Sequence, residues 1–297
     1  LVAASRGDGD SAAGIADLLH QAKADVVLNM TSFAVSDPSR GDDGMPEMRS
    51  VGPFGAVDAP VFQLVLSASL KDDWRDSSAG LTPRDLAMNV ALPELDGRVL
   101  TRAVGFKRPP TRHPVTHAMT TAYEPVPERA AFAARLAANW ARLRQTAAGD
   151  RKVALIMANY PNRDGRIANG VGLDTPASVF AAMQALADAG YAVRDMPEDS
   201  ADLIAQLKAG PTNAGWQGRQ SEITLPLAIY EQHFAALPAP VREAVTARWG
   251  APTADPMCDG ETLHLPLRRH GHVMVGIQPA RGYNIDPKST YHSPDLV

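Results

Sequence analysis

Residues 152–193 read KVALIMANYPNRDGRIANGVGLDTPASVFAAMQALADAGYAV, an apolar stretch followed by a polar loop, a helical pattern and a second extended stretch. Lys152–Ala158 is almost wholly apolar, which is typical of a buried parallel strand. Asp174 or Thr175 is placed to cap a helix, since a proline follows and apolar residues then recur at helical spacing. A glycine suits the helix end, and Tyr191–Val193 is expected to begin the next strand. The pattern predicts a strand–helix–strand unit of an α/β fold.

The connection between this strand and this helix, Asn159–Asp174, has sixteen residues. Such connections usually have about two to six, so roughly ten residues need another purpose. Ligands bind at the carboxyl ends of parallel strands, and a helix amino terminus there favours anionic groups. A ligand-binding loop and an ordinary turn-rich domain contact are equally expected from the spacing alone. The candidate substrate-binding residues are Asn162, Arg163, Arg166, Asn169, Gly170 and Gly172.

Nucleotide-binding motifs are weak or absent in the sequence. Gly170–Thr175 resembles a dinucleotide fingerprint, but it has threonine where the third glycine belongs and an aspartate beside the expected phosphates. No GxxxxGK[ST] motif occurs, so we do not expect this chain to hydrolyse ATP itself.

The overall composition is that of a globular protein of two domains. The chain has 297 residues, with 29 Lys and Arg against 33 Asp and Glu, giving a net charge of -4. This balance argues against nucleic acid or an anionic membrane as a main partner. The single cysteine, Cys258, excludes an internal disulfide and a cysteine-cluster metal site. With no secretory leader in view, we expect a cytoplasmic protein.

We predict two Rossmann-like parallel-sheet domains with helices on both faces, as a fragment of a larger multidomain subunit. Residues 1–110 form an α/β domain lacking its amino-terminal part, 111–150 a helical bridge, and 151–297 a second α/β domain with inserted helices, truncated at the carboxyl end. Strands are expected at 25–30, 61–67 and 273–277, two extended pieces within 90–106, and helices at 11–22, 82–88, 127–147, 200–208, 225–237 and 240–249.

The last twenty residues, 278–297, form a second polar loop after an apolar strand. The two strand-end loops are able to share one rim. His292 with Asp286 or Asp295 is a candidate catalytic base, and His292 with Asp295 a candidate metal site, since imidazole and carboxylate both bind divalent cations. Arg281 and Tyr283 are candidate substrate-binding residues. The alternative is that His292 is merely exposed and that Arg281 and Tyr283 pack the loop.

Two other groups favour structural roles. His270 and His272 share a face beside a strand, but no carboxylate is close in sequence and two arginines adjoin them. Glu94 and Asp96 are bracketed by proline and glycine, as in a turn. No GxSxG nucleophile motif is present, so hydrolase chemistry has no support.

Long motifs carry a family resemblance. Residues 66–107, LSASLKDDWRDSSAGLTPRDLAMNVALPELDGRVLTRAVGFK, residues 276–297, GIQPARGYNIDPKSTYHSPDLV, and the opening segment resemble the CobN family. These are the large subunits of aerobic cobaltochelatases, related to the magnesium chelatase H subunits.

The resemblance implies a multi-subunit, ligase-type enzyme that inserts the substrate metal Co²⁺ into hydrogenobyrinic acid a,c-diamide during cobalamin synthesis. ATP and Mg²⁺ would be used by AAA+ partner subunits of CobS and CobT type. Members are much longer and carry a His-Gly segment and a Glu downstream that this sequence lacks. We therefore expect an internal fragment that is inactive alone, with its catalytic site completed beyond Val297.

Two alternatives to this reading remain open. The chain is also similar to magnesium chelatase H subunits, which insert Mg²⁺ into protoporphyrin IX, although the TYHSPDL stretch at 290–296 favours the cobalt enzyme. A non-catalytic scaffold that docks the AAA+ subunits is the other alternative.

Overall fold

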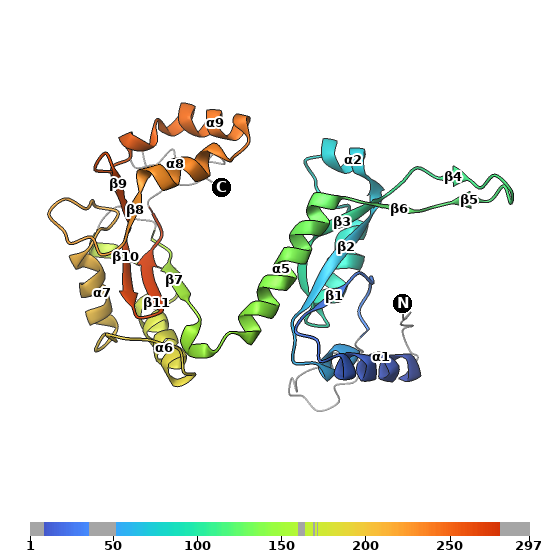
Figure 1. Cartoon of the computed structure of the whole chain (residues 1–297), viewed down its shortest axis with the longest axis horizontal. Coiled ribbons are helices and arrows are strands. Elements are labelled where there is room, and N and C mark those ends of the chain that lie inside the picture. Colours follow the sequence, from blue (N-terminus) through green and yellow to red (C-terminus); the bar gives the residue numbers. More distant parts are fainter. Residues whose placement is uncertain (1–8, 36–51, 160–163, 169, 171, 280–297) are drawn as a thin grey trace. The chain divides into compact units, whose positions relative to one another are not determined.

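The structure is a computed structural model that describes residues 9–35, 52–159, 164–168, 170 and 172–279. The chain divides into two compact units, unit 1 over Leu1–Gln145 and unit 2 over Thr146–Val297, and each is described by itself (Figure 1). Residues 111–150, predicted as a helical bridge, contain a strand of the unit 1 sheet and a helix that packs on it. The predicted three-part division stays a prediction.

Unit 1 has one main sheet with helices packed on both faces. Its elements are, in chain order, α1 (Gly9–Ala22), β1 (Val27–Asn29), η1 (Gly52–Ala56), β2 (Val61–Leu70), α2 (Lys71–Asp76), α3 (Pro83–Leu86), the π-helical turn η2 (Ala87–Ala91), α4 (Leu92–Glu94), β3 (Val99–Lys107), β4 (Thr111–Arg112), β5 (Met119–Thr120), β6 (Tyr123–Pro125) and α5 (Pro127–Gln145).

The unit 1 sheet has the strand order β1-β2-β3-β6, with β1, β2 and β3 parallel and β6 antiparallel to β3. Successive side chains of a strand point to opposite faces. Leu64 of β2 therefore packs with Ala133 of α5 on one face, while Val65 joins the core beside Trp74 of α2 on the other. The predicted strand at 61–67 is confirmed, whereas β1 is shorter than predicted and only partly buried.

The prediction of two extended pieces within 90–106 is wrong for the first of them. Residues 83–94 are helical, and only Val99–Lys107 is extended. The Leu92 N–H donates to the Ala87 carbonyl, which is a π-helical step, and Pro93 has no N–H to donate in the same pattern. The Met88 carbonyl instead accepts the Phe33 N–H at 2.8 Å. A residue distant in sequence thus satisfies a helix carbonyl. The local sequence pattern could not show this contact.

Unit 2 contains a smaller mixed sheet and the remaining helices of the described chain. Its elements are, in chain order, η3 (Ala148–Asp150), β7 (Val153–Met157), η4 (Asp164–Arg166), α6 (Thr175–Asp188), α7 (Ser200–Ala209), β8 (Thr224–Pro226), α8 (Leu227–Ala235), α9 (Ala239–Trp249), η5 (Pro252–Ala254), β9 (Thr262–His264), β10 (Leu267–His270) and β11 (Val273–Ile277). Strands β8 and β9 form a separate antiparallel pair.

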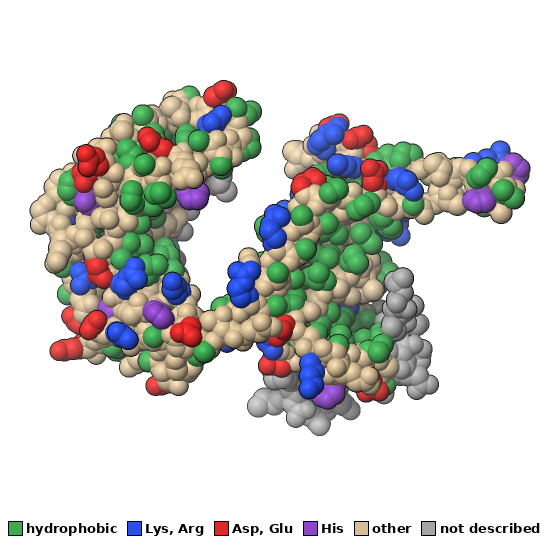
Figure 2. Space-filling model, in the orientation of Figure 1, with side chains coloured by type: hydrophobic (Ala, Val, Ile, Leu, Met, Phe, Trp, Pro, Cys, Tyr) green, Lys and Arg blue, Asp and Glu red, His purple; other side chains and the backbone are tan. Residues whose placement is uncertain are grey.

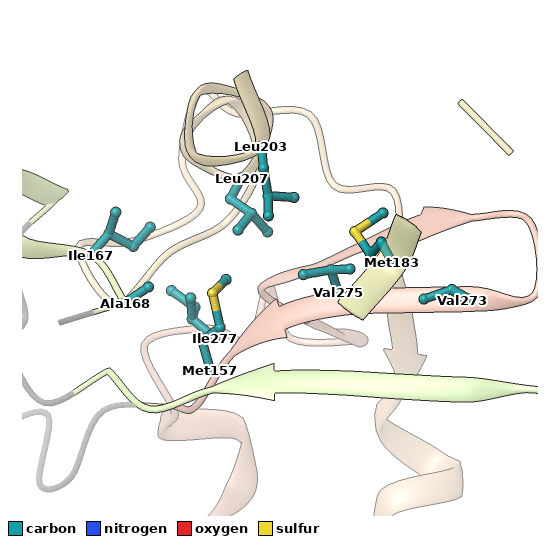
Figure 3. Packing of buried hydrophobic residues seen from close by; sticks show 9 residues of the cluster. All are labelled: Met157, Ile167, Ala168, Met183, Leu203, Leu207, Val273, Val275 and Ile277. Carbon is teal, nitrogen blue, oxygen red and sulfur yellow. The ribbon is translucent and has the colours of Figure 1, made fainter. Parts of the chain in front are cut away.

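The main sheet of unit 2 has the order β10-β11-β7, in which β11 and β7 are parallel and β10 is antiparallel to β11. One face carries a core to which α6 contributes Met183 and α7 contributes Leu203 and Leu207 (Figure 3). The predicted parallel strand is confirmed as β7, but it is buried on one face only, because Ile156 on the other face is 51% exposed. Both units are thus mixed α/β, and the finer Rossmann-like description stays a prediction.

The expected strand at Tyr191–Val193 is absent. This segment forms no ladder, and only two backbone bonds tie it to the β10–β11 turn, from His272 N–H to the Ala192 carbonyl and from Arg194 N–H to the His270 carbonyl. The Val193 N–H donates to the Tyr191 carbonyl at 2.8 Å, and this tight turn bends the chain out of an extended path. The sequence after α6 therefore returns to the sheet without joining it.

Candidate functional site

The carboxyl ends of β7 and β11 lie side by side, because Met157 and Ile277 are paired in register. The polar loops that follow these strands therefore leave from one edge of the sheet. Asn213, in the segment after α7, donates its Nδ2 to the carbonyls of Asn159 at 3.3 Å and Gln278 at 3.2 Å. We call the group formed by Asn159, Asn213 and Gln278 the carboxyl edge. Open parallel sheets bind their ligands at the edge where the strands have their carboxyl ends.

The loop after β7 folds back into the core. The Asn159 side chain accepts a hydrogen bond from the Ala168 N–H at 2.9 Å, and both Ile167 and Ala168 are buried. Part of the unusual length of this connection is thus explained by packing.

An ion pair ties the same loop to the segment after α7. Arg219 donates to Asp164 at 2.7 Å, and Thr212 donates to the other carboxylate oxygen at 2.6 Å. Arg219 also donates to the Thr212 hydroxyl at 2.8 Å. Burial alone would raise the pKa of Asp164, but the hydrogen bonds from Thr212 and Arg219 and the charges of Arg219 and Lys208 together lower it.

A histidine that lies between a serine and an aspartate is placed near this edge by the strand that follows it. His264 ends β9, and β10 then begins beside the end of β11. Its Nδ1 is 2.6 Å from the Ser221 hydroxyl and its Nε2 3.0 Å from Asp259, while Trp216 stacks on the imidazole with centroids 4.0 Å apart. Backbone hydrogen bonds from Glu261 and Thr262 lower the pKa of Asp259, and His264 lowers it further.

Such a group can take up a proton at the imidazole and share it with the neighbouring carboxylate or hydroxyl. No sequence motif indicated it, because Ser221 lies 43 residues before His264. Asn213, Thr212 and Arg219 were missed for the same reason, since their partners are 48 to 65 residues away.

Most predicted site residues fall outside the described part of the chain. These are Asn162, Arg163, Asn169, Arg281, Tyr283, Asp286, His292 and Asp295, together with the side chain of Arg166, whose backbone belongs to η4. The structure therefore brings together the starts of the two predicted loops, and the roles of these side chains stay predictions.

The two predicted glycines have local reasons to be glycine. A Cβ on Gly170 would lie 2.5 Å from the Thr175 hydroxyl, and Gly172 has a φ of +75° that side chains rarely adopt. Asp174 caps α6 by accepting the Ala177 N–H at 3.1 Å, which confirms one of the two expected caps. This carboxylate already accepts one of the N–H groups at the helix start, and the expected preference for an anionic ligand there stays a prediction.

The two histidines beside β11 bind backbone carbonyls. His270 Nδ1 is 2.8 Å from the Asp195 carbonyl, and His272 Nδ1 is 2.8 Å from the Gly149 carbonyl. Within the described ranges, no three His, Cys, Asp or Glu side chains are grouped so that they could hold a metal ion. Among those residues there is also no helix long and apolar enough to cross a membrane.

Comparison with known proteins identifies the family of this chain. The model of the family CobN/Magnesium Chelatase matches residues 1–297, which is the whole chain. The chain belongs to this family. It is 49% identical over 280 residues to an aerobic cobaltochelatase subunit CobN of a Sinorhizobium species, covering 94% of this chain and 21% of that protein. It is 44% identical to the CobN subunit of Pseudomonas aeruginosa, covering 96% of this chain and 22% of that protein.

A solved structure agrees with this membership of the CobN family. The catalytic subunit of cobaltochelatase from Mycobacterium tuberculosis superposes with a TM-score of 0.73 at 33% identity, over 95% of this chain and 23% of that one. The predicted resemblance to CobN is confirmed. The chain spans about a fifth of the length of these CobN relatives.

The CobN-like motif at 66–107 forms a buried polar network in unit 1 rather than an open site. Asp85 accepts hydrogen bonds from the Ser67 hydroxyl at 2.7 Å, the Ala68 N–H at 3.1 Å and the Asn89 side chain at 3.2 Å. Asn89 in turn accepts from Ser32 at 2.6 Å. The network joins the end of β2, α3 and the loop after β1.

A buried ion pair completes this network. Arg98 pairs with Asp96, and both side chains are fully buried. Arg98 also donates to the Thr31 carbonyl at 3.1 Å and to Gln63 at 3.3 Å, while Asp96 accepts the Val35 N–H at 2.9 Å. Burial lowers the pKa of the Arg98 guanidinium, against the opposing effect of Asp96. Asp96 therefore has a structural role, as its turn-like sequence indicated.

Proposed function

We propose that the chain is part of the large, tetrapyrrole-binding subunit of an ATP-dependent cobaltochelatase, which inserts Co²⁺ into hydrogenobyrinic acid a,c-diamide. The observation that carries the proposal is the similarity to cobaltochelatase subunits along nearly the whole chain. ATP and Mg²⁺ are assigned to AAA+ partner subunits of CobS and CobT type, since the sequence has no phosphate-binding GxxxxGK[ST] motif. A cytoplasmic location belongs to the same proposal.

The carboxyl edge supports a binding role for unit 2. Metal insertion requires a macrocycle that is held in place, two ring N–H protons that are removed, and Co²⁺ that exchanges its water for ring nitrogens. At this edge Asn213 donates to the Asn159 carbonyl, and the adjoining segment holds the Asp164–Arg219 pair. His264, between Ser221 and Asp259, is suited to accept a proton.

Roles for the two loops extend this proposal. We assign Arg163, Arg166, Asn169 and Arg281 to anchoring the acidic and amide side chains of the macrocycle, since arginine forms paired hydrogen bonds with carboxylates. His292, Asp286 and Asp295 are assigned to metal or proton handling. The remaining assigned binding residues are Asn162, Gly170, Gly172 and Tyr283.

Absorbance titration of the complete subunit with hydrogenobyrinic acid a,c-diamide tests the proposal. Binding should shift the corrinoid bands, and Arg166→Ala or Arg281→Ala should weaken the affinity by about tenfold each. Arg75→Ala is the control, because the side chain of this unit 1 arginine is 61% exposed and, among the described residues, its ion pairs are with its neighbours Asp72 and Asp76. Unshifted corrinoid bands in the wild-type subunit would refute the binding role.

A magnesium chelatase activity is the first alternative, because the family joins both kinds of enzyme. The same titration with protoporphyrin IX separates them. Tighter binding of protoporphyrin IX than of the corrinoid would favour the magnesium enzyme.

A docking role is the second alternative, and one feature of unit 1 favours it. Strands β4 and β5 form a hairpin that projects from the sheet (Figure 1), and every residue from 108 to 121 is exposed. Val115 is 79% exposed and Met119 63%. Basic, histidine and apolar side chains gather at its end (Figure 2), a composition suited to an acidic protein partner.

Shortening this hairpin tests the docking role. The Arg108 N–H donates to the Ala122 carbonyl at 2.9 Å, so an Asn-Gly turn in place of residues 109–121 would close the ribbon without disturbing the sheet. Loss of assembly with the AAA+ subunits in analytical ultracentrifugation, with corrinoid binding unchanged, would support docking. Unchanged assembly would remove this alternative.

A further inference from the structure

Asn213 has a buried side-chain oxygen without a partner. The residue is only 6% exposed, and its Nδ2 donates to the two carbonyls of the carboxyl edge, Asn159 and Gln278. Its Oδ1 is buried and has no hydrogen bond in the described part of the chain. A buried polar atom without a partner is unfavourable, and such exceptions in native proteins call for an explanation.

Rotating the amide does not remove the problem. Exchanging Oδ1 and Nδ2 would place the oxygen against two carbonyl oxygens, so the two hydrogen bonds fix which atom faces them. Because the amide is planar, Oδ1 is then directed away from both carbonyls. The orientation of this acceptor is therefore set by the backbone of both strand ends.

Donors beside Asn213 are already engaged. The Thr212 hydroxyl donates to Asp164, and the Ala214 N–H donates to Thr212. Arg219 donates to Asp164, Thr212 and the Gly210 carbonyl. A fixed acceptor with no local donor, at the sheet edge where ligands bind, is the arrangement expected of a group that recognises a ligand.

We propose that Asn213 Oδ1 accepts a hydrogen bond from a neutral N–H donor of the ligand, namely a carboxamide of the macrocycle. This inference rests on the proposed function and deepens it by naming a specificity residue. A carboxylate in the same place would set oxygen against oxygen, so the site would reject the non-amidated macrocycle. Asn213 would then select the substrate after two of its acid groups have been converted to amides.

Two ligands and two variants of the complete subunit test the inference. Dissociation constants for hydrogenobyrinic acid a,c-diamide and for hydrogenobyrinic acid, which has carboxyl groups in place of the two amides, are measured by absorbance titration. We expect the wild type to prefer the diamide by about tenfold or more. Asn213→Ala should weaken diamide binding by about tenfold and leave the acid nearly unchanged, so that the preference disappears.

Asn159→Ala is the matched control. Its side chain anchors Ala168 but has no assigned ligand contact, so a structural loss at the same edge should weaken both ligands equally and keep the preference. Thermal unfolding checks that the variants are folded. If Asn213→Ala does not fold, Asn213→Ser replaces it. Measurements on the wild type alone also test the inference, because equal affinity for the two macrocycles overturns it.

The outcomes separate the inference from the proposed function. A wild type that binds neither macrocycle overturns both of them. A wild type that binds both equally, or an Asn213 variant that keeps the preference, overturns the inference and leaves the proposed function standing. Loss of the preference with the control intact supports it.

Discussion

Two arginine–aspartate pairs, one in each unit, have similar chemistry in different surroundings. In unit 1, Arg98 and Asp96 are fully buried. In unit 2, the side chains of Arg219 and Asp164 remain 24% and 30% exposed, beside the carboxyl edge. The buried pair fixes the loops around the unit 1 sheet, whereas the second pair fixes a loop that water can still reach. Polar residues in this chain therefore have to be judged by their surroundings and not by their type.

The largest expected effect is at the buried pair. Arg98→Leu leaves the Asp96 carboxylate buried without its cation, so we expect the free energy of unfolding to fall by about 3–5 kcal/mol. Urea denaturation of the wild type and the variant measures it. Arg75→Leu, at an exposed arginine of the same unit, should change it by less than about 0.5 kcal/mol. Equal effects of the two substitutions would show that the Arg98 pair is not structural.

The next effect is at the buried carboxylate of the same network. Asp85→Ala leaves the Ala68 N–H and the Ser67 hydroxyl without their acceptor, and we expect a loss of about 3 kcal/mol in the free energy of unfolding. Ser67→Ala removes only one of these hydrogen bonds and should cost about 1 kcal/mol. Denaturation by urea of both variants gives the comparison, which a smaller loss for Asp85→Ala than for Ser67→Ala would contradict.

The unit 2 pair should give a smaller effect that depends on pH. Asp164→Asn should lower the free energy of unfolding by about 1 kcal/mol at pH 7, because the pair is partly exposed. The folded-state pKa of Asp164 is lowered from its ordinary value of 3.8, so its contribution is present above that value and is lost as the pH falls through the lowered pKa.

Unfolding curves between pH 7 and pH 2 check this dependence. The difference between the wild type and Asp164→Asn should shrink in the most acidic part of the range. A difference that stays constant to pH 2 would mean that the charge of Asp164 has no part in it.

The smallest effect is expected at the unit 1 hairpin. Val115→Ser and Met119→Ser should each change the free energy of unfolding by less than about 0.5 kcal/mol, since both side chains are exposed. Thermal unfolding of each variant measures it. A loss above about 1 kcal/mol would show that the hairpin is packed against another part of the protein.

Much of the fold could be predicted from local patterns. The helices at 11–22, 127–147 and 200–208 and the strands at 61–67 and 273–277 all appear, because periodicity and caps act over neighbouring residues. The errors have causes outside their segments. Residues 90–94 are helical with help from Phe33, and Tyr191–Val193 bends instead of joining the sheet.

The candidate site was predictable only in part. That two strands would end in polar loops is visible in the sequence, and their pairing in parallel brings the loop starts together. The residues that connect those starts were not visible. Asn213 is 54 residues from Asn159 and 65 from Gln278, and no spacing rule relates a side chain to a carbonyl so far along the chain.

The parallel pairing of β7 with β11 also sets an order of events during synthesis. Val153 pairs with Val273, 120 residues later, and β7 has no other strand partner in the described sheet. At about 5–20 residues per second, a ribosome needs about 6–24 s to make the intervening chain. Throughout that interval the backbone groups of β7 that will bond to β11 lack this partner strand. The β7–β11 pair can therefore form only after β11 has left the ribosome, so this sheet depends on a late contact between segments far apart in sequence.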